Sequence, residues 1–192
     1  MKTKLILMLP LICFATVNAQ DELPYYEIPE YPAAYNECTV VARMIDGLGF
    51  RFYWATEGLR PEDLAFKPSE KGRTTLETID HIVGLTNFVL NSALKKVNEP
   101  LDTEGMTFDE KRAITLKMLK QAADIFRDCD DLSKFKIVFK RGDTTNELPF
   151  WNQINGPIAD ALWHTGQVVT HRRTSGNPFN SNVSVFTGTV RQ

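Results

Sequence analysis

Apolar residues recur with helical spacing in four separate stretches of the chain. In the first, they fall at intervals of three and four residues, which places them on one face of an amphipathic helix. These residues are Val41, Met44, Ile45, Leu48 and Phe52. The sequence therefore predicts a long helix that starts at Asn36, ends near residues 56–59 before Pro61, and is followed by a loop over residues 60–73.

Two capping boxes mark the starts of the next two helices. In Thr74–Glu77 and Thr107–Glu110, a threonine is followed three residues later by a glutamate, so each side chain can bond the backbone amide of the other. The second helix is predicted to reach about residue 97 and is apolar over most of its circumference, as expected of a helix packed on several sides. The third is predicted to end at about residue 129.

A hairpin and a fourth helix follow. Residues 135–139 are rich in β-forming residues and precede the turn-forming sequence Arg141-Gly142-Asp143, so a hairpin is predicted with its return strand at residues 147–150. The fourth helix is expected to open at Asn155-Gly156-Pro157, because proline suits a first helical turn, and to end at Ser175. Four long helices in one domain predict an all-α fold, an antiparallel four-helix bundle over residues 36–178.

Residues 1–19 have the pattern of a secretory signal peptide. Two lysines precede an apolar run that ends in Val17-Asn18-Ala19. The run is too short to cross a bilayer as a helix, which takes about 20 residues. We expect cleavage after Ala19, export to the periplasm or the exterior, and no membrane association afterwards. The alternatives are an uncleaved anchor and a buried helix.

Segments without helical periodicity flank the predicted bundle. Residues 20–35 contain three prolines and four tyrosines, which prevents a regular helix and predicts an extended arm laid along the body. Residues 179–192 form a polar, β-like tail that is expected to extend past the body.

Composition narrows the class of protein. A chain that is 43% hydrophobic and 24% charged fits one globular domain and excludes a disordered chain, a collagen-like fibre and a small cysteine scaffold. A net charge of −2 provides no basic excess, so a dedicated nucleic-acid-binding function is not expected. The chain also lacks a CxxCH haem motif, an HExxH zinc helix, a glycine-rich phosphate loop and a Gly-x-Ser-x-Gly elbow.

The fourth helix carries an unusual polar stripe. Asp160, His164, Gln167 and His171 share one face, where a solvent-exposed helix usually presents lysine and glutamate. Imidazole and carboxylate groups suit Zn²⁺, Ni²⁺ or Fe²⁺, so Asp160 and His164, four residues apart, can bind one ion. A third ligand has to come from elsewhere, and His81 is the remaining histidine. The alternatives are a plain Asp160–His164 hydrogen bond, a satisfied buried His81, and His171 as a cap or rim residue.

Two motifs resemble those of the DinB-like (YfiT-type) metalloenzyme superfamily. Thr74-Leu76-Glu77…His81-Ile82 is similar to its second-helix signature, and Ala161–Gln167 to its last-helix motif, a histidine followed two residues on by Gly-Gln. The resemblance covers residues 39–178, and Phe150–Pro178 is especially similar to exported members.

The resemblance implies an up-down-down-up four-helix bundle and a divalent metal, most often held by three histidines. By position, His81 and His164 are ligands, and Asp160 stands where the family has its remaining histidine. This departure gives a two-histidine, one-carboxylate set, in which His171 is an alternative ligand. Gln167 is expected to orient the substrate or a water at the metal.

These features predict a metal-dependent enzyme of the hydrolase or transferase type that acts on a small molecule of unknown identity. The metal would acidify a water or polarise a substrate oxygen. The alternative is a non-catalytic exported bundle that binds a partner and has a structural or degenerate metal site. The resemblance also implies a homodimer.

The implied topology bears on Cys38 and Cys129, the two cysteines that follow the predicted signal peptide. In an up-down-down-up bundle, the start of the first helix and the end of the third lie at the same pole, and export supplies an oxidising compartment. A disulfide between them is therefore expected. Two separate buried thiols are the alternative, because a shared pole does not ensure contact.

Overall fold

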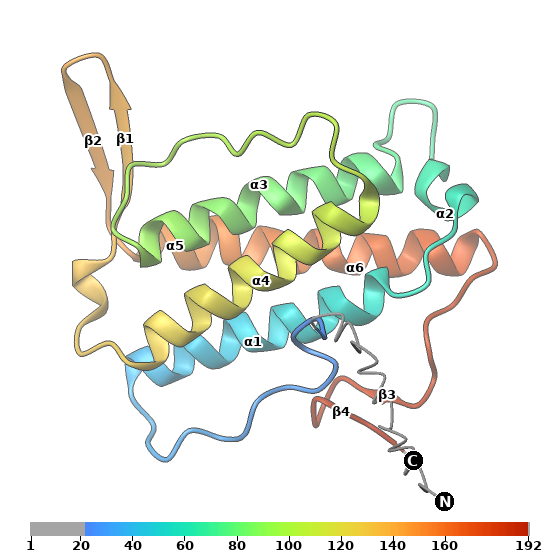
Figure 1. Cartoon of the computed structure of the whole chain (residues 1–192), viewed down its shortest axis with the longest axis horizontal. Coiled ribbons are helices and arrows are strands. Elements are labelled where there is room, and N and C mark those ends of the chain that lie inside the picture. Colours follow the sequence, from blue (N-terminus) through green and yellow to red (C-terminus); the bar gives the residue numbers. More distant parts are fainter. Residues whose placement is uncertain (1–21, 192) are drawn as a thin grey trace, which may run out of the picture.

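The computed structural model describes residues 22–191, and they are predominantly helical, as the sequence predicts. The long helices are α1 (Glu37–Thr56), α3 (Thr75–Ala93), α4 (Phe108–Arg127) and α6 (Ala159–Thr174) (Figure 1). The predicted signal peptide lies outside the described residues. Among the described residues, no helix is both long and apolar enough to cross a membrane.

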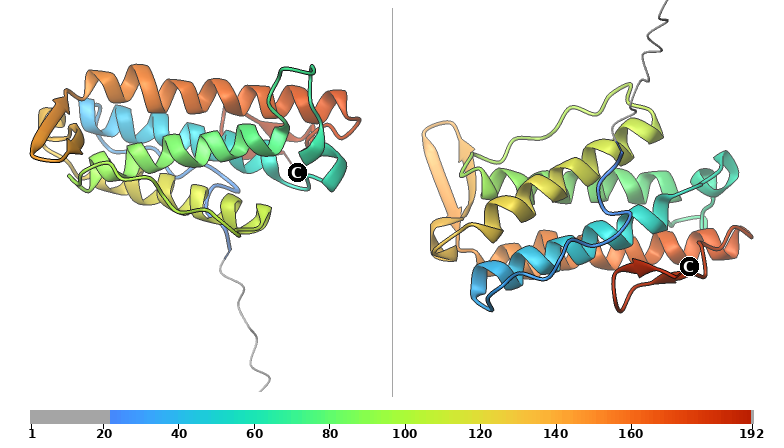
Figure 2. Two further views of the ribbon diagram at one scale, coloured as in Figure 1. Left: turned by 90° about the horizontal axis from the view of Figure 1, so that it is seen from above. Right: turned by 60° about the horizontal axis from the view of Figure 1, so that its bottom comes forward.

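The four long helices pack around one apolar core. Helix α1 packs against α4 and α6, and α3 packs against the same two helices, so α1 and α3 lie diagonally opposite each other. Helices α1 and α6 run in one direction and α3 and α4 in the other, which makes the 94–107 connection travel back along the molecule (Figures 1 and 2). The fully buried core side chains include Ile45, Leu48, Phe52, Ile79, Ile82, Leu116, Leu119 and Phe126.

Both predicted capping boxes are confirmed. The hydroxyl of Thr74 accepts from the amide of Glu77 at 3.1 Å, and the Glu77 carboxylate accepts from the amide of Thr74 at 2.7 Å. Thr107 and Glu110 repeat the arrangement at the start of α4. These starts could be predicted because a capping box satisfies otherwise unpaired amides through contacts within four residues.

Helix α3 ends at Ala93, four residues before the predicted end near Val97. Lys95 has a φ of 55°, which turns the chain out of the helix. Val97 then forms a parallel bridge with Val138, and the amide of Asn98 donates to the carbonyl of Val138 at 2.7 Å. Pairing with the hairpin therefore overrides the helical pattern of the sequence.

The predicted hairpin is present, with strands β1 (Ile137–Arg141) and β2 (Thr144–Leu148). Arg141 pairs with Thr144, which leaves a two-residue turn of Gly142 and Asp143. Gly142 has a φ of 56°, the conformation that tight hairpin turns require and that glycine adopts without strain. This turn brings the return strand forward to Thr144, three residues before the predicted start.

Short helical elements occur in predicted loops and at the predicted start of the fourth helix. The expected loop 60–73 contains α2 (Pro61–Ala65), which has proline in its first turn. Helix α6 is preceded by α5 (Trp151–Gln153) and by a π-helical turn, η2 (Ile154–Ile158), and a 3₁₀ turn, η1 (Leu132–Lys134), precedes β1. Pro157 thus lies inside a helical run and does not open it. Proline lacks an amide hydrogen and disrupts the regular α-helical bonding pattern, so its position in the irregular η2 turn is favourable.

The arm and the tail pack together on α1. The Tyr25 hydroxyl donates to Asp46 at 3.1 Å, and the Trp54 indole donates to the carbonyl of Tyr26 at 3.0 Å. The tail does not extend past the body as expected. Its strands β3 (Val183–Ser184) and β4 (Thr189–Val190) form a small hairpin, and Val183 is buried against Phe50 and Trp54.

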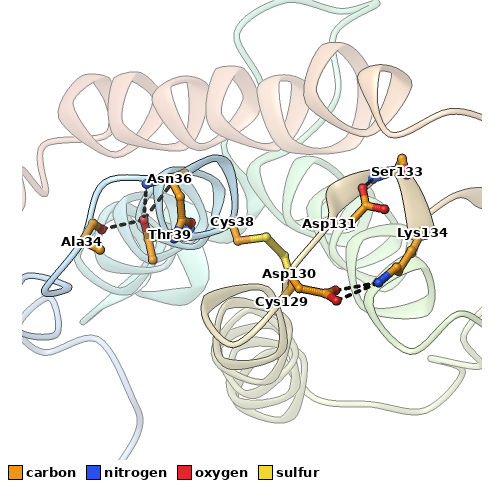
Figure 3. Close-up of a disulfide and its surroundings, with 9 residues drawn as sticks. All are labelled: Ala34, Asn36, Cys38, Thr39, Cys129, Asp130, Asp131, Ser133 and Lys134. Carbon is orange, nitrogen blue, oxygen red and sulfur yellow. Dashed lines mark hydrogen bonds and ion pairs between the residues drawn. A yellow bond between two sulfur atoms is a disulfide. The ribbon is translucent and has the colours of Figure 1, made fainter.

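A disulfide joins Cys38 at the start of α1 to Cys129 just after α4, which confirms the expected pairing (Figure 3). The two Cα atoms are 5.7 Å apart, within the normal range for a disulfide. The bond fixes one pole of the helix pair α1 and α4.

Candidate metal centre

The three predicted ligands come together between α3 and α6. His81 lies in the second turn of α3, whereas Asp160 and His164 lie in the first two turns of α6. One ligand atom from each side chain lies within 4.8 Å of the others. All three residues are partly buried, so the cluster is held by two packed helices and still reaches solvent.

Asp160 uses its two carboxylate oxygens to approach the two imidazoles separately. Oδ2 lies 3.3 Å from Nε2 of His81, and Oδ1 lies 3.3 Å from Nε2 of His164. The two imidazole rings meet edge to face, with their centroids 4.6 Å apart. Each of the two nitrogen–oxygen distances matches the separation of about 3.3 Å between neighbouring ligands of a tetrahedral zinc ion with bonds of about 2.0 Å.

Gln167 fixes the orientation of His164. Nδ1 of His164 donates to Oε1 of Gln167 at 2.7 Å, and an amide oxygen can only accept. In the neutral imidazole, Nε2 therefore presents its lone pair toward Asp160. Two lone-pair-bearing atoms 3.3 Å apart repel each other unless a cation lies between or beside them, either a metal ion or a proton on Nε2. The sequence analysis assigned Gln167 to the substrate or a water, whereas the structure shows it holding a predicted ligand.

His171, the alternative ligand, is placed apart from the cluster. Its ring is buried beside Phe66, with centroids 5.5 Å apart, and its Nδ1 lies 3.2 Å from the hydroxyl of Thr75. Burial lowers the pKa of His171. The structure therefore makes it a packed side chain near the end of α6, not the cap or rim residue that the sequence suggested. Its i+7 spacing from His164 could not reveal this, because the neighbouring side chains come from other elements.

Two clefts flank the cluster along the seam between α3 and α6. On the hairpin side, a cleft of about 440 Å³ reaches Asp160 and is lined mainly by apolar residues. On the opposite side, a cleft of about 470 Å³ is lined by His164, Gln167 and His171 together with Arg73, Thr78 and Thr170. The sequence analysis missed both clefts, since each is formed by segments distant in the sequence.

Comparisons with protein-family models, curated proteins and solved structures find no match. The DinB-like resemblance therefore rests on the motifs quoted above and stays a prediction.

Replacing Gln167 with alanine is expected to lower the affinity for zinc by about 10- to 100-fold, because a ligand imidazole that loses its partner is no longer held in one tautomer. Gln167→Glu should retain most of the affinity, since a carboxylate also accepts from Nδ1. Gln121→Ala, at an exposed position on α4, is the matched control. Competition with a chromophoric zinc chelator measures the affinities, and an unchanged value for Gln167→Ala would show that this contact does not support metal binding.

Proposed function

We propose that the chain is a metal-dependent enzyme of the hydrolase or transferase type, with one divalent ion held by His81, Asp160 and His164. The observation that carries the proposal is the geometry around His164. Its Nδ1 is committed to Gln167, so its Nε2 faces the Asp160 carboxylate 3.3 Å away, a placement in which one ion can be bound by both groups. His81 completes the set from a second helix.

The donor set suits zinc best, with nickel and iron as alternatives, because two imidazoles and one carboxylate are common ligands of all three ions. Such an ion supplies Lewis acidity, which lowers the pKa of a water or polarises a substrate oxygen. The protein residues orient the ligands and keep one side of the cluster open. The exposed fractions of the His81 and Asp160 side chains, 34% and 37%, leave space for a small-molecule substrate.

The helix directions support a wider proposal about fold and location. The directions and contacts of the four long helices support the up-down-down-up bundle implied by the DinB-like resemblance. The Cys38–Cys129 disulfide favours an oxidising compartment, which agrees with export of the chain.

One observation favours a second candidate, a non-catalytic binding protein. Asp160 already contacts both imidazoles, so a proton on His164 Nε2 could satisfy the cluster as a hydrogen-bonded network without metal. The two candidates differ in whether the folded chain retains an ion.

Metal analysis of the oxidised protein, purified without chelators, decides between them. We expect about one equivalent of metal per chain, lost in His81→Ala and in the double variant Asp160→Ala/His164→Ala, with the helical circular dichroism signal retained. His171→Ala is the control and should keep the metal, because His171 lies outside the cluster. Stoichiometric metal in the double variant would overturn the assigned site, and metal-free wild type that also fails to take up zinc would favour the binding protein.

A further inference from the structure

The cleft on the hairpin side of the metal centre is a largely apolar groove. Its apolar lining consists of Leu85, Phe88, Ile137, Phe139, Leu148 and Pro157, and Asn152 and Asn155 also line it. Asp160, a proposed metal ligand, lines the same groove. Its volume of about 440 Å³ is within the usual range for small-molecule sites, about 300–1,000 Å³.

The groove continues the faces that carry the ligands. On α3, Leu85 and Phe88 follow His81 by four and seven residues, so they lie on the same side of the helix. On the other wall, Pro157 precedes Asp160 by three residues in the π-helical turn. A molecule bound at the centre can therefore extend along this seam without leaving the surface of the protein.

The hairpin forms the outer wall of the groove. Ile137 pairs with Leu148 across the two strands, and the ring of Phe139 packs against that of Phe88 with centroids 5.9 Å apart. The side chains of Phe88, Phe139 and Leu148 are only partly buried. Apolar surface left open to water next to a polar centre is typical of a site that takes an apolar group.

The opposite cleft differs in chemistry. Besides Pro68 and Gly72, it is lined by the polar side chains of Arg73, Thr78, His164, Gln167, Thr170 and His171, so it carries more polar groups than the hairpin groove. The apolar part of a ligand is therefore better accommodated on the hairpin side than on the side of His164.

We infer that the substrate carries an oxygen-containing group that reaches the metal centre and an apolar substituent, aryl or alkyl, that occupies the hairpin groove. The inference rests on the proposed function, because the metal centre supplies the anchor for the polar group. It adds the substrate class and the residues that select it, above all Phe139 and Leu148.

Two hydroxamates with the same chelating group and different substituents test the inference. Isothermal titration calorimetry on the zinc-loaded full chain compares acetohydroxamic acid with 3-phenylpropanohydroxamic acid. We expect the phenyl probe to bind about 10- to 30-fold more tightly, as burial of an aromatic ring predicts. Phe139→Ser and Leu148→Ser should each reduce this preference to about threefold or less and leave the affinity for acetohydroxamic acid unchanged. Phe186→Ser, at a position that is 98% exposed, is the matched control and should keep the preference.

The outcomes separate this inference from the proposed function. A chain that binds neither zinc nor either probe overturns both. If the chain binds zinc but binds the two probes with equal affinity, or binds neither probe, the substrate class is overturned and the metal centre is left intact. If both serine variants keep the preference for the phenyl probe, its phenyl group binds elsewhere, and the role of the groove is overturned. Circular dichroism and zinc content confirm that each variant is folded and loaded.

Discussion

Replacing Arg172 with alanine is expected to destabilise the fold by about 3–5 kcal/mol, because the change removes charged hydrogen bonds and opens a cavity. The Arg172 side chain is buried, with only 3% of the residue exposed. Its Nη1 donates to the carbonyls of Trp54, Ala55 and Glu57 at 2.9–3.1 Å, and its Nε donates to the carbonyl of Asn177 at 2.7 Å.

The contacts of Arg172 replace a missing helix cap. The last turn of α1 contains no basic residue of its own, and its final carbonyls have no partner within the helix. A cation at this end also interacts favourably with the helix dipole. Burial lowers the pKa of Arg172, yet a guanidinium group stays charged at neutral pH. Loss of this side chain therefore leaves several buried carbonyls unpaired at once.

Urea unfolding followed by circular dichroism measures the effect, and the neighbouring Arg173→Ala is the matched control. Arg173 is exposed and lies over the ring of Phe179 at 5.5 Å, so its loss should cost less than about 1 kcal/mol. Equal losses for the two variants would show that Arg172 does not cap α1. Arg172→Lys should recover only part of the stability, because one ammonium group cannot reproduce the planar array of donors.

Removing the disulfide with Cys38→Ala/Cys129→Ala is expected to lower the free energy of unfolding by about 4 kcal/mol in the chain-entropy model. The bond closes a loop with a sequence separation of 91 residues, and a long loop restricts the unfolded chain strongly. Urea unfolding under non-oxidising conditions compares the double variant with the wild type.

The reduced wild type is the control for the disulfide, because it keeps both sulfur atoms and loses only the bond. Its stability should fall to within about 1 kcal/mol of the double variant, since both lose the same constraint on the unfolded chain. A thiol titration of denatured, non-reduced protein should find neither Cys38 nor Cys129 free. Two free thiols per mature chain, or a double variant as stable as the oxidised wild type, would contradict the expected role of the bond.

The sequence predicted best those features that depend on neighbouring residues. The helix starts at Thr74 and Thr107 were predicted correctly because each capping box is complete within four residues. The predicted end of α3 near Val97 was wrong because Val97 pairs with Val138, about 40 residues further along the chain. Met44 belonged to the predicted apolar stripe of α1 but is 45% exposed, since the width of the buried face depends on which helices pack there.

In the candidate site, too, the features set by nearby residues could be predicted, and those set by packing between elements could not. Spacing alone placed Asp160 and His164 on one face of a helix, and the DinB-like resemblance added His81 from another helix. The bond between His164 and Gln167 follows from their i, i+3 spacing and could have been read as a positioning contact. The burial of His171 and the hairpin groove could not be predicted from one sequence, because both depend on how separate elements pack.

The diagonal placement of α1 and α3 determines when the chain can fold. These long helices are consecutive in the sequence, yet each packs on α4 and α6, so they cannot form a stable hairpin of their own. The apolar face of α1 stays uncovered until synthesis has passed Arg127 at the end of α4. Such non-local pairing raises the contact order and slows folding. An N-terminal fragment without α4 is therefore expected to stay unfolded, which is the state in which a chain can be threaded through a narrow channel.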